Sequence, residues 1–242
     1  MKFKIIRYKN IKSTQIIANN LAKKGMKEGI VILTEKQSCG IGRNNNNWFS
    51  PKGGIWLSII LRPKNKINFI QLFGLIIAYL ISSTIKDITK IITTIKLPND
   101  ILINKKKVCG ILVDSIFKGN KIDYMIIGIG ININFRTKIL PKEIISNSTT
   151  LRDEYGKEID IDEFLSKFLD NFNELYQKLI TQPRTTLKEI TNHGLRNKLI
   201  TIRDKNKTLL GKLIELKYNN IEIELPSKEI KQYDYKNIIY IE

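Results

Sequence analysis

The chain has 242 residues and a mass of 28.0 kDa, which allows one large domain or a large domain with a small appendage. Hydrophobic residues make up 42% of the chain, enough for a sizeable core, so the composition argues against a disordered protein. With only Cys39, Cys109 and His193 as soft ligands, a disulfide framework, a zinc site and a histidine-based metal centre are not expected. The start of the chain, MKFKIIRYKN, is mixed and polar rather than a secretory signal, and we expect a cytoplasmic protein.

The formal net charge of +18 does not by itself indicate a nucleic-acid-binding protein. Lysines greatly outnumber arginines and accompany many isoleucines and asparagines, the pattern that A/T-rich codons produce. The basic residues are scattered rather than gathered in a stripe, and Lys105–Lys107 is their one triple. We therefore expect no specific DNA binding, only weak attraction to acidic partners at low salt.

Hydrophobic periodicity predicts alternating helices and strands in the first half of the chain. Ser13 and Thr14 are typical N-cap residues for a helix that ends near Gly25. Strands are predicted over 29–35 and 55–61, with a polar, glycine-containing loop between them over 36–54.

The segment 67–85 contains no charged residue and approaches the length that spans a bilayer. Polar residues such as Asn68 and Gln71 interrupt it, which favours a helix buried in a soluble core. No membrane association is expected.

Further along, the pattern predicts a strand over 92–97, a hairpin over 101–115 that turns near 104–106, a long strand over 121–135 and an amphipathic helix over 161–180. Past residue 194, short β-like runs separated by Asn, Lys and Gly predict a small, partly open β-barrel. We therefore expect a domain over 1–194 and a small β domain over 195–242.

Several segments carry polar groups that serve no obvious purpose in a core. Ser13, Thr14 and Gln15 stand at a helix start, where they form either an ordinary cap or a set of hydrogen-bonding groups for a small polar ligand. In the loop TEKQSCGIGRNNNNWFSPKGG, Gly40 and Gly42 allow the backbone to approach a ligand closely. Arg43 adds donors suited to phosphate or carboxylate, and Trp48 offers a stacking surface for a flat ring.

Two more segments suggest a ligand that lies on a sheet. In KLPNDILINKKKVCGILVDS, Lys107 directly precedes an apolar strand, and Gly110 in mid-strand is typical of close approach by a backbone or ligand. In GIGININ, alternation places Asn132 and Asn134 on one face of a strand that also contains glycines.

The ordered motifs ST(Q), QSCGIGRNNNNWFSPKGG, KLPNDIL, KVCGILVD and GIGININ closely resemble the biotin–protein ligases, and the resemblance covers most of residues 13–134. It implies an α+β fold with a mixed, largely antiparallel sheet backed by helices, similar to class II synthetases, followed by a small SH3-like β-barrel. It also implies a short form that lacks the N-terminal DNA-binding domain of repressor-type members, because the ligase motif already begins at Ser13.

The resemblance implies that the protein joins biotin to ATP, with Mg²⁺ accompanying ATP, to give biotinyl-5′-AMP, and then transfers biotin to a lysine of a biotin carboxyl carrier domain of an acyl-CoA carboxylase. By the same resemblance, the catalytic residues are Lys107 and Arg43, and no residue is assigned to a resident metal. The implied biotin-binding residues are Ser13, Thr14, Gln15, Gln37, Ile41, Gly42, Arg43, Lys107 and Gly110. The implied nucleotide-binding residues are Gly40, Gly42, Arg43, Trp48, Asn99 and Asn132. A homodimer is possible, since sheet-edge dimers are common in the family.

The chain departs from the family pattern in the phosphate loop. Ile41 replaces an arginine, and Asn45 and Asn46 replace a glycine and another arginine. Gln15 replaces the more usual asparagine, and Leu97 the usual tryptophan. We expect an active ligase that retains its adenylate less firmly.

The sequence leaves three other functions open. A lipoate- or octanoate-transferring enzyme of related fold differs at the biotin-side residues Ser13, Thr14, Gln15 and Gln37. A basic nucleic-acid-binding protein is favoured only by the charge, and it predicts steeply salt-dependent binding without ATP turnover. A degenerate ligase retained as a binding protein would fail to form the adenylate in a single turnover.

Overall fold

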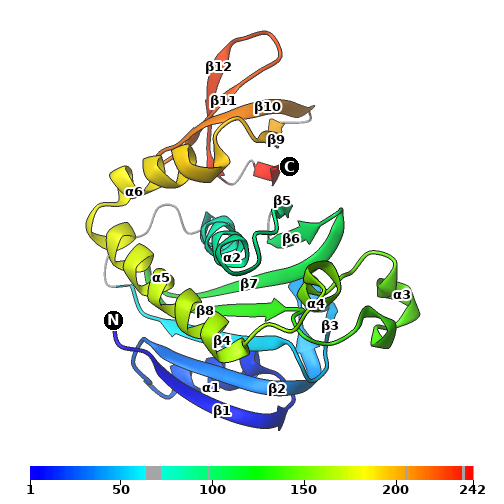
Figure 1. Ribbon diagram of the computed structural model, residues 1–242. Coiled ribbons are helices and arrows are strands. Elements are labelled where there is room, and N and C mark those ends of the chain that lie inside the picture. The colour runs from blue at the N-terminus through cyan, green and yellow to red at the C-terminus, as the bar shows by residue number, and fades with distance from the viewer. Residues whose placement is uncertain (64–71, 97–98, 205–206, 236–237, 242) are drawn as a thin grey trace.

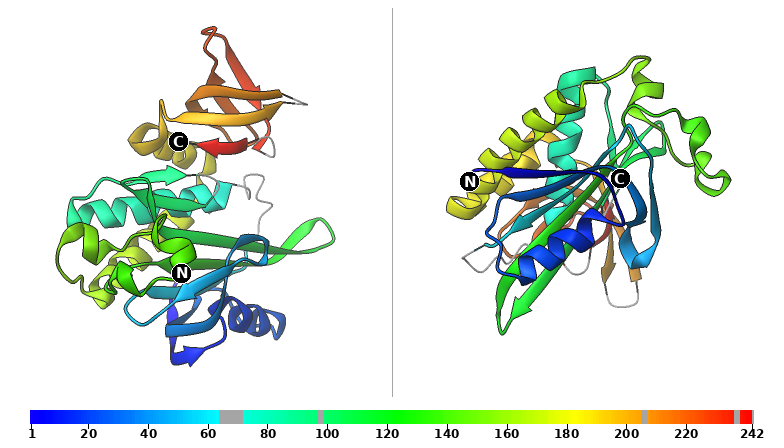
Figure 2. Two further views of the ribbon diagram at one scale, coloured as in Figure 1. Left: turned by 90° about the vertical axis from the view of Figure 1, so that its right-hand side faces the viewer. Right: turned by 90° about the horizontal axis from the view of Figure 1, so that it is seen from below.

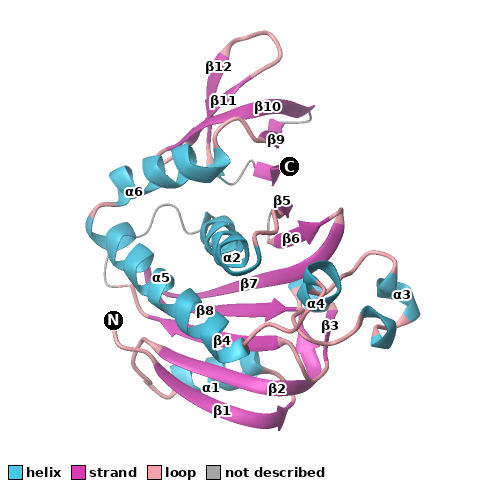
Figure 3. Cartoon of the chain, viewed as in Figure 1, coloured by secondary structure: helices cyan, strands magenta, loops and turns pink. Residues whose placement is uncertain are grey.

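The computed structural model describes residues 1–63, 72–96, 99–204, 207–235 and 238–241, and it contains two β-sheets with helices packed around the first (Figures 1 and 3). In the larger sheet the strands follow the order β1-β2-β4-β8-β7-β6-β5, and β3 pairs with β2 outside this path. The pairing of β1 with β2 is parallel, and every other pairing in this sheet is antiparallel. The strands are β1 (Lys4–Ile11), β2 (Ile30–Ile41), β3 (Asn47–Ser50), β4 (Ile55–Leu61), β5 (Thr94–Lys96), β6 (Asp100–Ile103), β7 (Lys106–Lys118) and β8 (Lys121–Ile131).

Helices cover both faces of the larger sheet, and alternation along the strands decides which residues meet which helices. The helices are α1 (Thr14–Lys23), α2 (Phe73–Thr89), α3 (Lys142–Ile145), α4 (Leu151–Tyr155), α5 (Ile161–Thr181) and α6 (Pro183–Ile190). Val31, Leu57 and Ile127 point to the face that α2 and α5 cover, where the main apolar core lies. Ile32 and Ile60 point to the opposite face, where they pack against α1 in a smaller core. We call this second face the α1 face.

The fold confirms the predicted α+β architecture of a mainly antiparallel sheet backed by helices. The hairpin of β6 and β7 turns at Asn104 and Lys105, which both have positive φ, as two-residue hairpin turns require. The buried helix is α2, and the amphipathic helix is α5. The front of the predicted 67–85 segment, together with Leu97 and Pro98, lies outside the described residues.

The predicted loop over 36–54 is partly wrong. β2 continues as far as Ile41, a short 3₁₀ turn follows over Arg43–Asn45, and β3 returns antiparallel to β2. β1 was not predicted, because most of its residues are exposed and its sequence therefore lacks a clear apolar alternation. The strand predicted over 121–135 ends at Ile131, so alternation does not continue to Asn134.

The second sheet contains β9 (Leu199–Asp204), β10 (Lys207–Leu216), β11 (Ile221–Glu224), β12 (Ile230–Tyr233) and β13 (Ile238–Ile241), in the order β12-β11-β10-β9-β13. It lies beyond α6 and the π-helical turn Thr191–Leu195 (Figure 2). Its buried residues, such as Ile200 and Ile223, belong to the same apolar cluster as Leu187 of α6. The division at residue 194 and the SH3-like barrel remain predictions.

No helix among the described residues combines the length and the apolar character that a membrane crossing requires.

Arg62, directly after β4, fastens the C-terminal end of α1 to the sheet. Its guanidinium donates to the backbone oxygens of Ala22 at 2.5 Å and Met26 at 2.9 Å, and to Asp123 Oδ1 at 3.2 Å. A cation at the C-terminus of a helix also compensates the partial negative charge of the helix dipole. The opposite end of α1, with Thr14 and Gln15, is thereby held at a fixed place over the sheet.

Asp153 in α4 holds the segment that follows β8. Its carboxylate accepts hydrogen bonds from Arg136 Nη1 at 2.9 Å, from the backbone N–H of Thr137 at 2.8 Å and from the Thr137 hydroxyl. Burial on its own raises the pKa of Asp153, but these hydrogen bonds outweigh it and lower the pKa to about 2. Its stabilising contribution is therefore complete above the pKa of an unfolded-state aspartate and is lost as the pH falls through about 2.

We expect Asp153→Asn to lower the free energy of unfolding at pH 7 by on the order of 1 kcal/mol, the worth of a partly exposed hydrogen-bonded carboxylate. The difference from the unsubstituted protein should shrink between pH 4 and pH 2, as urea denaturation at each pH would measure. Asp170→Asn, at an exposed position of α5, serves as the control. An unchanged difference over this pH range would contradict the assignment.

Candidate active site

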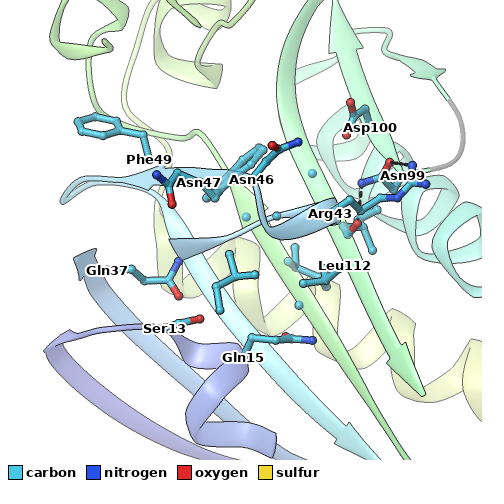
Figure 4. Close-up of a pocket in the computed structure, with 18 of the residues that line it drawn as sticks. Ser13, Gln15, Gln37, Arg43, Asn46, Asn47, Phe49, Asn99, Asp100 and Leu112 are labelled. Carbon is cyan, nitrogen blue, oxygen red and sulfur yellow. Dashed lines mark hydrogen bonds between the residues drawn. The ribbon is translucent and has the colours of Figure 1, made fainter. Parts of the chain in front are cut away.

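A cavity of about 340 Å³ opens on the α1 face, between the N-terminus of α1 and the ends of β4, β7 and β8 (Figure 4). Its position follows from the strand pattern. Leu57, Ile111 and Ile129 point into the main core, so their neighbours Ser58, Gly110 and Gly130 face the opposite side. Where apolar side chains would otherwise meet α1, the strands carry a hydroxyl and glycines, and this leaves room for Trp48 and Gln15 to lie on the sheet and line the cavity.

The structure brings the predicted site residues together, with one exception. The cavity is lined by Ser13, Thr14, Gln15, Gln37, Ile41, Gly42, Arg43, Trp48, Asn99, Lys107, Gly110 and Asn132. Gly40 does not line it. A Cβ at Gly40 would lie 2.3 Å from the backbone oxygen of Trp48, so this glycine permits the close pairing of β2 with β3.

Polar groups from α1, β2 and β4 form one end of the cavity, which we call the polar floor: Ser13, Thr14, Gln15, Gln37 and Ser58. Gln37 Oε1 accepts from the backbone N–H of Thr14 at 2.8 Å, while its Nε2 donates to Ser50 Oγ at 2.8 Å. Thr14 Oγ1 lies 3.2 Å from Gln37 Oε1 and 2.9 Å from Ser58 Oγ. Ser58 Oγ is also 2.9 Å from Gln15 Oε1. A continuous row of oxygen atoms results.

Ser13 occupies the N-cap position of α1, but its side chain makes no capping hydrogen bond. Its hydroxyl is buried and has no partner among the described residues. Burying a hydroxyl without a partner is unfavourable, so this atom is better explained as a ligand-binding group than as a cap.

Two cations line the other end of the cavity. Arg43 Nη1 donates to Asn99 Oδ1 at 3.2 Å (Figure 4). Lys107 Nζ lies 2.7 Å from Asp100 Oδ1. Lys107 is fixed through its backbone as well, because its N–H donates to the oxygen of Asn147 and its own oxygen accepts from Thr149. Positive groups from distant segments, the 3₁₀ turn and β7, thus meet at one site.

Trp48 covers the glycines of the sheet. A Cβ at Gly130 would lie 2.4 Å from Trp48 Nε1, and a Cβ at Gly110 would lie 2.7 Å from Trp48 Cζ3. Lys107 Nζ stands 4.8 Å from the centre of the Trp48 ring, within the range of a cation–π contact. Trp48 Nε1 is buried without a partner among the described residues, like the hydroxyl of Ser13.

The two asparagines of GIGININ have different roles. Asn132 lines the cavity and donates through Nδ2 to the oxygen of Thr149 at 2.9 Å. Asn134 does not line it, and instead exchanges hydrogen bonds with the backbone of Ile159. The prediction that both lie on one face of a strand is wrong, because β8 ends at Ile131.

Sequence reasoning missed Ser58, Asp100 and Gly128 as individual site residues. A lone hydroxyl in the otherwise apolar run IWLSIIL was a usable signal for Ser58. A Cβ at Gly128 would lie 2.5 Å from Gln15 Oε1. The glycines of GIGININ predict a close approach to this strand, but they do not single out Gly128. Among the described residues, no three His, Cys, Asp or Glu side chains gather closely enough to hold a metal ion.

Comparison with known proteins identifies the class. The model of the biotin/lipoate A/B protein ligase family matches residues 8–132, slightly more than half of the chain, and the chain belongs to this family. It is 35% identical to the bifunctional ligase/repressor BirA of Bacillus subtilis over 185 residues, which cover 76% of this chain and 57% of that protein. It therefore spans little more than half the length of this relative.

Shorter relatives match over more of their length. The biotin–[acetyl-CoA-carboxylase] ligase of Paracoccus denitrificans is 27% identical over 70% of this chain and 71% of its own. The structure of the biotin protein ligase from Aquifex aeolicus in complex with biotin and ATP superposes with a TM-score of 0.76 at 28% identity, and covers 98% of both chains.

We expect Gly130→Ala to push the indole of Trp48 off the sheet, because the added methyl group overlaps the ring. Tryptophan emission should shift to longer wavelength and become easier to quench with acrylamide. Trp48 and Trp56 are the two tryptophans, and Trp56 is fully buried, so a shift reports Trp48.

Gly130→Ala combined with Trp48→Phe supplies the control and should give the same spectrum as Trp48→Phe alone. Gly119→Asn, at a hairpin tip where a Cβ meets nothing within 4 Å, controls for glycine replacement in general. A spectrum of Gly130→Ala identical to that of the unsubstituted protein would show that Trp48 does not lie on this glycine.

Proposed function

We propose that this protein is an ATP-dependent biotin–protein ligase that forms biotinyl-5′-AMP and transfers biotin to a lysine of a biotin carboxyl carrier domain of an acyl-CoA carboxylase. Its family membership and its similarity to a ligase structure that contains biotin and ATP support this proposal. The observation that carries it is the hydrogen-bond inventory of the polar floor.

The polar floor has more oxygen–oxygen contacts than protons to fill them. Its contacts join Thr14 to Gln37, Ser58 to Thr14, and Ser58 to Gln15. The Thr14 and Ser58 hydroxyls supply two protons for these three contacts, and the glutamine oxygens are pure acceptors. The longest contact, 3.2 Å from Thr14 Oγ1 to Gln37 Oε1, needs no proton of its own, because Gln37 Oε1 already accepts from the backbone N–H of Thr14. The polar floor therefore presents an excess of acceptor oxygens, which suits a ligand that donates N–H groups.

The ureido ring of biotin carries N–H donors beside a carbonyl acceptor, and the partnerless hydroxyl of Ser13 is a suitable donor to that carbonyl. The dithiolane ring of lipoate and the methyl end of octanoate carry no N–H group. The polar floor therefore favours biotin over the lipoyl substrates that other members of the family use.

The cations at the opposite end fit the chemistry of adenylate formation. The biotin carboxylate must approach the α-phosphate of ATP, and two unit charges 4 Å apart repel by about 4 kcal/mol at an effective dielectric of 20. In our proposal Lys107 and Arg43 reduce this repulsion and stabilise the charge that develops at phosphorus, and Mg²⁺ enters with ATP as part of the substrate. The carboxylate displaces pyrophosphate, and the acceptor lysine then displaces AMP from the mixed anhydride.

The position of Lys107 suggests how its charge is held before substrates bind. Asp100 neutralises the ammonium in the structure, at 2.7 Å, and the Trp48 ring lies beside it. When a carboxylate and a phosphate enter, the ammonium can exchange its contact with the ring for contacts with these anions, without crossing the cavity.

The test of the function is an ATP–pyrophosphate exchange assay with biotin, lipoate or octanoate, followed by mass spectrometry of a biotin carboxyl carrier domain. We expect exchange with biotin only, and a carrier that gains the mass of one biotinyl group at its acceptor lysine. Exchange with lipoate or octanoate and not with biotin would refute the proposal, and so would the absence of exchange with all three.

We expect Lys107→Met to slow biotin-dependent exchange by about 10²- to 10³-fold, the usual cost of removing one electrostatic donor from a transition state. Lys106→Met is the matched control, because it removes the same charge from the adjacent, exposed position of the same strand. Equal loss of rate in the two variants would mean that general charge, and not a contact in the cavity, is responsible.

A further inference from the structure

The amide of Gln15 has one end in the polar floor and the other end against an acidic side chain outside it. Gln15 is buried in the first turn of α1, and its Oε1 faces Ser58 Oγ at 2.9 Å. Its Nε2 donates to Asp114 Oδ2 at 2.8 Å, and a second, longer contact of 3.4 Å leads to the backbone oxygen of Ile126. The amide thus bridges β4, β7 and β8.

Strand register explains why Asp114 reaches this place. Leu112 of β7 lies opposite Gly128 of β8, and Asp114 lies opposite Ile126. Residues two apart on a strand share a face, so Asp114 points to the same side as Leu112, which lines the cavity. Gly128, without a side chain, leaves the space that the Gln15 amide occupies.

The carboxylate of Asp114 determines the orientation of the Gln15 amide. The oxygen and nitrogen ends of a glutamine amide have nearly the same shape and opposite hydrogen-bonding character. A reversed amide would place Oε1 against the carboxylate of Asp114, where two acceptors repel each other. A hydrogen bond to a charged group is also stronger than one between neutral groups, so Asp114 outweighs the long contact to Ile126.

We propose that Asp114 is a positioning residue, which fixes the Gln15 amide with its oxygen towards the polar floor and so makes the site selective for a ligand with N–H donors. This inference rests on the proposed function for the identity of the ligand, but the orientation of the amide does not depend on it. Without Asp114 only the long contact to the Ile126 oxygen holds the amide in this orientation. A reversed amide would turn Nε2 towards Ser58, and the polar floor would lose the acceptor oxygen of Gln15 that an N–H ligand uses.

The first measurement concerns the amide itself and needs no ligand. In a sample labelled with ¹⁵N-glutamine, the side-chain amide of Gln15 is identified by its loss in Gln15→Leu. We expect its protons to exchange with solvent about tenfold faster in Asp114→Ala, a factor that corresponds to about 1.4 kcal/mol. Asp114→Asn, which keeps an acceptor oxygen, should restore slow exchange.

The second measurement is isothermal titration with biotin and, separately, with ATP. We expect Asp114→Ala to weaken biotin binding by about five- to twentyfold, the effect of one lost hydrogen bond, and to leave the affinity for ATP unchanged. In the ATP–pyrophosphate exchange assay, kcat at saturating biotin should also be unchanged. Asp114→Asn, whose amide can pair with either orientation of the Gln15 amide, should recover the affinity only in part. Glu35→Ala, which removes the same charge from an exposed ion pair on β2, is the control and should bind biotin normally.

The outcomes separate the two proposals. If Asp114→Ala leaves both amide exchange and biotin affinity unchanged, the positioning role is refuted. If amide exchange responds to Asp114→Ala but Asp114→Asn does not restore it, a general effect of charge replaces the proposed acceptor contact. If the unsubstituted protein does not bind biotin, the proposed function fails, while amide exchange still decides whether Asp114 orients Gln15.

Discussion

Alternation along β4, β7 and β8 is the constraint on which the site depends. Around the site, alternate residues of these strands, such as Leu57, Ile111 and Ile129, are apolar and belong to the core that α2 and α5 cover, and this fixes the register of the sheet. The residues between them are therefore held on the α1 face, whatever they are. Here they include Ser58, Gly110 and Gly128, which carry small side chains or none, so that Trp48 and Gln15 can lie on the sheet and line the cavity. Stability and ligand binding thus use opposite faces of the same strands.

Neutral hydrogen-bonding groups and charged groups lie at opposite ends of the cavity. Neutral oxygens gather at the end near α1, and the cations Arg43 and Lys107 lie near β6 and the 3₁₀ turn. Such a site suits an elongated ligand with a polar, uncharged head and an anionic tail. This separation has a physical advantage, since a cation beside the polar floor would compete with the ligand for its acceptors. Ile41 and Asn46 also line the cavity and carry no charge, so Arg43 and Lys107 supply the positive groups of this end.

Much of the fold and of the site could be predicted from the sequence, and the failures have physical causes. The hairpin of β6 and β7, the buried helix α2 and the amphipathic helix α5 follow from periodicity, because each depends on a burial pattern within one segment. β1 and the extension of β2 could not be predicted, since their pairing depends on partners distant in sequence and their side chains are mostly exposed. Ser13 was predicted as a hydroxyl at a helix start, and Gln37 through motif resemblance, and both line the cavity. Ser58 became recognisable only when the register placed it beside Gln15.

The attachment of α1 links distant parts of the protein to the ligand. Arg62 anchors the C-terminal end of this helix, whereas Thr14 and Gln15 stand at the other end, about 15 Å away for ten residues at 1.5 Å each. When a rigid helix pivots near one end, a small movement there becomes a larger movement at the other end. Slight loosening around Arg62 would therefore move the polar-floor atoms of Thr14 and Gln15 further than it moves Ala22. A substitution at Arg62 would in this way alter the geometry of the cavity, although Arg62 does not line it.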